Sequence, residues 1–217
     1  LMSVQPSISA IKAAQAVNFF LQESASDPRS VDGDMYLKLI KLLWAADRFS
    51  LRNFGNEVTE DHYSAMPYGP VASETYNLIL ACRPGALVDT RWISEPDAQW
   101  WKEHFETRKY AMNTVADPGS DYLSRADILM LETAYSHFRD TGRFETASNI
   151  SHIYPEWSKA FKPQASRKSF DIDTLDFFDD PENQRDPYFQ VDPETLESAR
   201  YFFNERQDLS KSIGIAL

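Results

Sequence analysis

The chain has 217 residues, of which 42% are hydrophobic and 13% aromatic, enough to bury the core of one domain with or without an extension. Its formal net charge of −11 makes nucleic acid an unfavoured partner, because affinity for phosphate backbones depends mainly on lysine and arginine. The single cysteine, Cys82, excludes an intramolecular disulfide and a thiolate zinc site. No apolar run could span a bilayer and no secretion signal is recognisable, so we expect no membrane contact and a cytoplasmic location.

The chain is expected to open with a disordered lead-in over residues 1–8. A first helix then begins near Ser9, with Ser7 or Ser9 as its N-cap, and apolar residues recur at helical spacing beyond it. Residues 24–33 are rich in serine, aspartate and glycine, which predicts a loop before the next helix.

A second helix is predicted over residues 34–51, and it is apolar on nearly every side, which is typical of a buried core helix. We expect Lys38 and Lys41 to keep their ammonium groups in water by extending along the surface. Asp47 falls near the core, and we interpret it as a hydrogen-bond anchor for the next loop. Gly55 is expected to end the helix in the left-handed conformation.

A short strand is predicted within residues 58–66, and a second one over residues 87–93 could pair with it in a small sheet. Between them, Gly69 precedes a proline and is therefore expected to be extended, while Pro70 fixes its own φ. The result is a rigid corner. It could be purely architectural, or it could present Tyr68 to a partner.

Helix-start signals continue in the second half of the chain, at Ser94 and in the capping-box pattern of residues 124–127.

The amino-acid composition changes after residue 162. Residues 171–208 contain 12 acidic residues against three arginines, which marks a charge boundary. A last helix is predicted over residues 193–207.

No catalytic, cofactor-binding or metal-ligating constellation emerges from the residue spacing. The four histidines lack zinc-site spacing, and the seven glycines form no phosphate-binding loop. His152 and the aromatic residues near positions 100 and 157 are interpreted as packed structural residues. A carboxylate–histidine site built from Asp47 and His152 stays open as an enzyme alternative.

Two blocks of sequence nevertheless carry motifs in a specific order. The first is KLIKLLWAADR followed by FGNEVTEDHYSAMPYGPV, and the second is LETAYSHFRDTGRFETASNISHIYPEWSKAF. Together they resemble the Panacea, or SocA-like, antitoxin domain family over about residues 10–162, with Ser151 where the family usually has threonine. The matching positions are Lys38, Leu39, Lys41, Leu42, Leu43, Trp44, Gly55, Val58, Ala65, Tyr68, Gly69, Pro70, Val71, Gly142, Ser148, His152 and Trp157.

The resemblance implies an antitoxin without enzymatic activity that silences a cognate protein toxin by direct binding. It also leaves open a protease adaptor or scaffold, because one relative delivers its toxin for degradation, so a cellular protease is a second possible partner. We expect a mainly α-helical domain over residues 9–162 with a small β-hairpin or short antiparallel sheet, and an acidic extension over residues 163–217 that ends in a helix.

The extension has two alternative interpretations. It could pack back on the domain, or its aromatic side chains could anchor a toxin while its carboxylates steer a basic surface of that toxin. The candidate partner-binding residues are Tyr68, Pro70, Phe177, Phe178, Tyr188, Phe189, Phe202 and Phe203.

Overall fold

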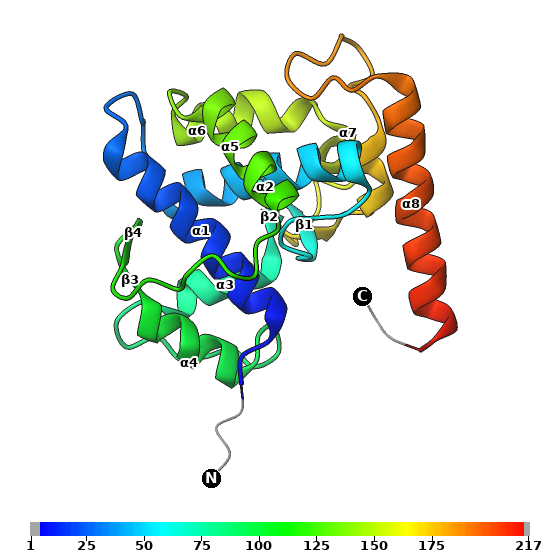
Figure 1. The fold of residues 1–217 in the computed structure, drawn as a ribbon. Coiled ribbons are helices and arrows are strands. Elements are labelled where there is room, and N and C mark those ends of the chain that lie inside the picture. Colours follow the sequence, from blue (N-terminus) through cyan, green and yellow to red (C-terminus); the bar gives the residue numbers. More distant parts are fainter. Residues whose placement is uncertain (1–4, 215–217) are drawn as a thin grey trace.

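The computed structural model describes residues 5–214, and most of its elements are helices (Figure 1). The α-helices are α1 (Ile8–Ser26), α2 (Tyr36–Phe54), α3 (Ser73–Ala81), α4 (Glu95–His104), α5 (Arg125–Phe138), α6 (Arg143–Glu145), α7 (Pro155–Ser158) and α8 (Pro193–Ser212). One π-helical segment, η1 (Thr146–Ile150), and two 3-10 segments, η2 (Ser151–Ile153) and η3 (Thr174–Phe178), join them. The strands are β1 (Tyr63–Met66), β2 (Gly69–Ala72), β3 (Phe105–Arg108), β4 (Ala111–Thr114) and β5 (Phe170–Asp171). The predicted fold class, mainly α with short antiparallel sheets, is confirmed.

Local capping sets the start of several helices. Of the two predicted N-cap candidates, Ser7 caps α1 by accepting a hydrogen bond from the Ala10 amide, and Ser94 caps α4 by accepting one from the Asp97 amide. The amide of Ser7 also donates to Asp97 at 2.6 Å, so the end of the expected lead-in is bonded to α4. Residues 1–4 of that lead-in lie outside the described residues.

The helix α2 crosses the middle of the molecule, with α1, α5 and α8 packed around it (Figure 1). Every residue from Lys38 to Arg52 is buried, as expected for a helix that is apolar on nearly every side. The helix begins two residues and ends three residues later than predicted, and it stops at Gly55, whose φ of 74° confirms the predicted left-handed termination.

A three-stranded antiparallel sheet, in the order β2-β1-β5, lies beside α2. The predicted strand over residues 87–93 is wrong: that segment is a loop, and its Leu87 is 94% exposed. The partners of β1 are instead β2, which follows it after two residues, and β5, which comes from the C-terminal extension. Because β2 is an edge strand, Pro70 fits there without removing a bond from the sheet interior.

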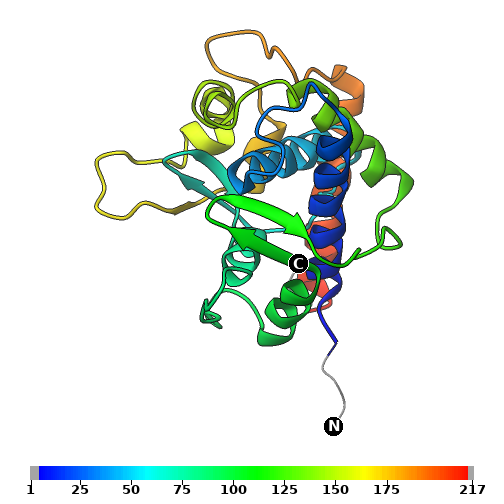
Figure 2. The same cartoon turned by 90° about the vertical axis from the view of Figure 1, so that its left-hand side faces the viewer.

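A second hairpin, formed by β3 and β4, follows α4 directly and is visible face-on in Figure 2. The sequence analysis did not predict it. Burial alternates along β3, with Phe105 and Thr107 inside, and the turn uses Lys109 at a φ of 57°. Burial alternates over only four residues of β3, which is too short a pattern to predict a strand, and the pattern directly follows the helix predicted from Ser94.

The C-terminal extension packs back on α2. Arg52 organises the contact by donating to the carbonyl oxygens of Phe177, Phe178, Asp179 and Phe189 at 2.9–3.3 Å. A buried guanidinium needs several acceptors, and the irregular backbone of this segment supplies them.

Of the two interpretations left open for the extension, this packing supports the first, and it corrects the second for most of the aromatic residues named as surface anchors. Phe177, Phe178, Phe189 and Phe203 are at most 4% exposed and belong to the hydrophobic core. Tyr188 is half-buried against the same core. Phe202, on the outer side of α8, remains 61% exposed.

Candidate interaction site

Charged side chains that are at most 1% exposed run along α2: Lys38, Lys41, Asp47, Arg48 and Arg52. Lys38 donates to the carbonyl oxygens of Phe138 and Thr141, at the end of α5, and Lys41 donates to that of Pro70. The prediction that both ammonium groups reach water is therefore wrong, because backbone carbonyls replace water as acceptors. Burial lowers the pKa of Lys38 to about 8 and that of Lys41 well below its ordinary value.

Asp47 anchors the loop between α2 and β1. One carboxylate oxygen accepts the amides of Val58 and Thr59 at 2.6 and 3.1 Å, and the other accepts the hydroxyls of Thr59 and Tyr63 at 2.6 Å each. Burial raises the pKa of Asp47 to about 7, although these hydrogen bonds oppose the shift. Asp47 therefore has the loop-anchoring contacts that the sequence analysis expected.

An ion pair with no exposed atoms joins α2 to α7. Glu156 accepts the Arg48 guanidinium at 2.6 Å and the Trp44 indole nitrogen at 2.8 Å. The guanidinium also lies 4.2 Å from the centroid of the Tyr154 ring. Sequence reasoning missed this cluster. A charged residue inside an apolar helix signals that a partner exists, but it does not say which of 33 acidic residues is that partner.

The corner between β1 and β2 is built around Gly69. It is the first residue of β2, in agreement with the expected extended conformation, but its φ is +90°, a value that residues with a Cβ rarely adopt. Pro67 cannot adopt the positive φ that two-residue hairpin turns favour, and the reversal is completed at the glycine instead. Pro70 is buried and cannot contact a partner, whereas Tyr68 is 55% exposed.

An exposed aromatic pair marks this corner. The rings of Tyr68 and Phe144, each 55% exposed, have centroids 6.1 Å apart. Phe144 belongs to α6, far from Tyr68 in sequence, and the Arg143 guanidinium lies 4.6 Å from its ring centroid. We call Tyr68 and Phe144 the corner pair.

Two ring systems from the second sequence block, those of His152 and Trp157, pack against the corner. The rings of His152 and Trp157 stack with centroids 3.6 Å apart at 4°, and the Trp157 indole donates to the Met66 carbonyl at 2.8 Å. Burial first, and then the neighbouring Lys41 charge, lowers the pKa of His152 to about 4. His152 thus packs as the structural residue that the sequence analysis described.

The lowered pKa of His152 gives a pH prediction. Its folded pKa lies below the ordinary 6.5, so its contribution to stability is complete above pH 6.5 and is lost as the pH falls toward 4. We expect the difference in unfolding free energy between wild type and His152→Gln to shrink as the pH falls across that window. Asp47 and Asp61 have raised pKa values, so they change stability in the opposite direction, but both proteins contain them and their contributions cancel in the difference. Titration of the imidazole by NMR should give a midpoint near 4, and a midpoint near 6.5 would contradict the buried stack.

The structure does not bring Asp47 and His152 together as a catalytic pair. Within residues 5–214 no hydrogen bond joins them, and both oxygens of Asp47 already have partners in the loop before β1. In the same part of the chain, no group of three or more His, Cys, Asp or Glu side chains is arranged to hold a metal ion. Nor does any described helix combine the length and apolarity needed to cross a bilayer.

These observations define the class of protein. It is mainly helical, its central helix α2 is buried together with several charged side chains, and its corner at Gly69 and Pro70 exposes the corner pair. The family model described as "Antitoxin SocA-like, Panacea domain" matches residues 39–158, slightly more than half of the 217 residues. The chain belongs to this family. Comparison with curated proteins and with solved structures gave no match.

Proposed function

We propose that this protein is an antitoxin that neutralises a cognate protein toxin by direct binding in the cytoplasm, without enzymatic activity of its own. Membership of the SocA-like Panacea family carries the proposal. A second observation supports it. The buried charged side chains of α2 bind carbonyls, amides and carboxylates of the same chain, which suits a rigid binding scaffold better than a reactive site.

The corner pair is the part of the family region that we propose contacts the toxin. Aromatic residues are enriched in protein interfaces because they bury a large area with few rotatable bonds. The turn that carries Tyr68 is fixed on both sides, by the hydrogen bond from Trp157 to the Met66 carbonyl and by Gly69 at its positive φ, so little backbone entropy is lost on binding.

Co-expression with the toxin encoded beside this chain's gene tests the proposal. We expect wild type to restore growth while the toxin level stays constant. A fall in toxin level, measured by immunoblot, would point instead to the protease-adaptor alternative. Absence of rescue with every neighbouring reading frame would contradict an antitoxin function.

The double variant Tyr68→Ala/Phe144→Ala should lose rescue at toxin doses that wild type tolerates. Each truncation of a central aromatic contact typically costs about 1–2 kcal/mol of binding. The matched control is Trp92→Ala, which removes another aromatic side chain that is 61% exposed. Both proteins should keep the wild-type melting temperature, and full rescue by the double variant would remove the corner pair from the interface.

A further inference from the structure

The helix α8 presents two apolar stripes, of which the protein covers only one. Ala199, Phe203 and Ser210 face the body of the molecule and are buried. On another side of the helix, Phe202, Leu209 and the C-cap residue Ile213, which directly follows α8, are 60–61% exposed. Spacings of seven and four residues place these three on one face, over about 16 Å of helix axis. We call them the α8 stripe.

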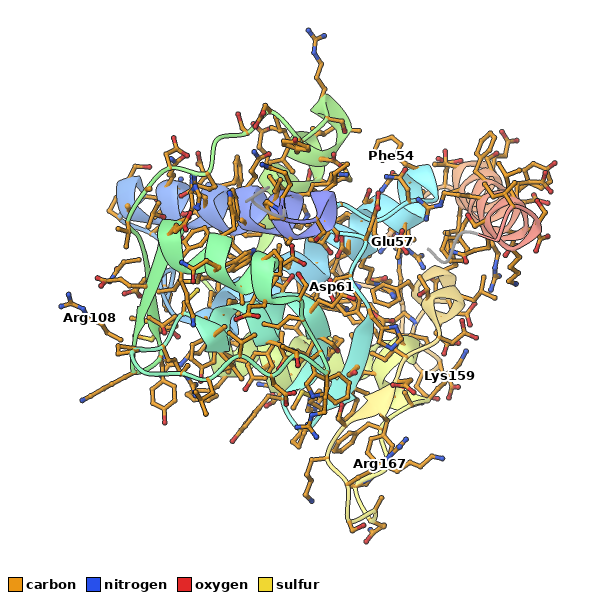
Figure 3. The ribbon with its side chains drawn as sticks, turned by 90° about the horizontal axis from the view of Figure 1, so that it is seen from below. Phe54, Glu57, Asp61, Arg108, Lys159 and Arg167 are labelled. Carbon is orange, nitrogen blue, oxygen red and sulfur yellow. The ribbon has the colours of Figure 1, made fainter. Side chains whose placement is uncertain are left out.

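A cleft extends this stripe onto α2. It has a volume of about 400 Å³ and lies between the end of α2 and the start of α8. Its lining includes Phe202 and Phe54, the latter 42% exposed. Figure 3 shows Phe54 at the end of α2, next to α8. The rest of the lining is mostly polar, from Asn53, Asp192, Glu194, Thr195 and Ser198. The stripe and the cleft together form one strip, apolar at Phe54 and along the stripe and acidic inside the cleft, that is long enough for three turns of a partner helix.

Carboxylates border this strip. Asp192 and Glu194 line the cleft, and Glu205, three residues after Phe202 and four before Leu209, lies on the side of the helix that carries the stripe; all three are exposed. Both arginines of the helix are already paired: Arg200 with Asp179 at 3.1 Å, and Arg206, which lies on the same side of the helix as the stripe, with Glu57 at 2.7 Å. Lys211, 4.0 Å from Asp208, leaves the border mainly negative.

We propose that the α8 stripe and its cleft bind an amphipathic helix of the toxin that carries lysine and arginine beside its apolar face. The inference rests on the proposed function. It adds a second contact with the toxin, made by residues outside the family region of residues 39–158, and it states what kind of toxin segment binds there. Charge complementarity selects this occupant. A second copy of the chain would bring the same carboxylates together in a protein of net charge −11, which is unfavourable.

Binding to the purified toxin provides the first test. The variant Phe202→Ser/Leu209→Ser/Ile213→Ser keeps every charge and alters only exposed side chains, so it should fold as wild type does. We expect its Kd for the toxin to rise by about 30-fold or more, as for the loss of interface hot spots. The control Leu87→Ser/Val115→Ser, which removes exposed apolar side chains elsewhere, should leave the Kd unchanged.

A synthetic probe makes the test independent of the toxin. An 18-residue helical peptide of leucine and lysine at heptad spacing should bind wild type at least about tenfold more tightly than the stripe variant, and its leucine–glutamate twin should bind neither. Equal binding of the lysine peptide to both proteins would overturn the inference, even where toxin rescue succeeds. Failure of rescue with retained, stripe-dependent peptide binding would overturn the proposed function alone. A dimer seen by light scattering that the stripe variant dissociates would identify a second copy as the occupant and would also overturn the inference.

Discussion

Replacing Glu156 with alanine is expected to destabilise the protein by about 3–5 kcal/mol, because it leaves the Arg48 guanidinium buried without its closest carboxylate. The Trp44 indole loses its acceptor in the same step. Asp186, 3.8 Å from the guanidinium, is too distant to replace the 2.6 Å contact. For a chain of this length the loss corresponds to a melting temperature lower by roughly 10 °C.

Thermal and urea unfolding measure this effect. The matched control is Glu132→Ala, which removes an exposed glutamate from α5 and should change stability by less than about 0.5 kcal/mol. The double variant Arg48→Met/Glu156→Met should be more stable than Glu156→Ala, since it leaves no unpaired buried charge. Stability of Glu156→Ala within about 1 kcal/mol of wild type would show that the pair is dispensable.

The second large effect is expected for Gly69→Ala. A Cβ atom at this position would overlap the Ser151 hydroxyl and lie 3.0 Å from the Lys41 amine and 3.1 Å from the Ala147 carbonyl oxygen. The positive φ adds about 1–2 kcal/mol for any residue with a Cβ, and the overlap adds about 1–3 kcal/mol. We therefore expect a total loss of roughly 2–5 kcal/mol.

The chain offers a control that separates the two costs. Gly85 has a φ of +73°, and a Cβ there meets no atom within 4 Å, so Gly85→Ala should cost only the backbone strain. Adding Ser151→Ala to Gly69→Ala removes the overlapping hydroxyl and should recover part of the stability. Urea unfolding of the four proteins measures each difference. Equal losses for Gly69→Ala and Gly85→Ala would refute close packing of the corner against Ser151.

The two substitutions probe opposite ends of one arrangement. Gly69 determines the backbone conformation of the corner. The Arg48–Glu156 pair holds α7 against α2, and Trp157 of α7 packs against the corner. Damage at either end should displace Tyr68 and weaken toxin rescue. The corner-pair variant is expected to keep the wild-type melting temperature, so it separates that indirect loss from the loss of direct contact.

Features that depend on a few neighbouring residues could be read from the sequence. The N-caps Ser7 and Ser94, the capping box of Ser124 and Asp127 and the left-handed Gly55 all form as expected. The reason is that each of these hydrogen bonds, or each backbone conformation, joins residues at most four positions apart. The apolar pattern of α2 likewise determined its burial, since hydrophobic residues on nearly every side leave it no stable place at the surface.

Only the tertiary structure decided which distant groups meet. The sequence does not reveal that β5 pairs with β1, that the α5 end accepts Lys38 or that Glu156 is the partner of Arg48. The sequence also does not predict that Phe203 is buried and Phe202 exposed, because the burial of each depends on which face of α8 packs against α2. Burial and pairing across more than 90 residues are properties of packing, which no local pattern of residue types encodes.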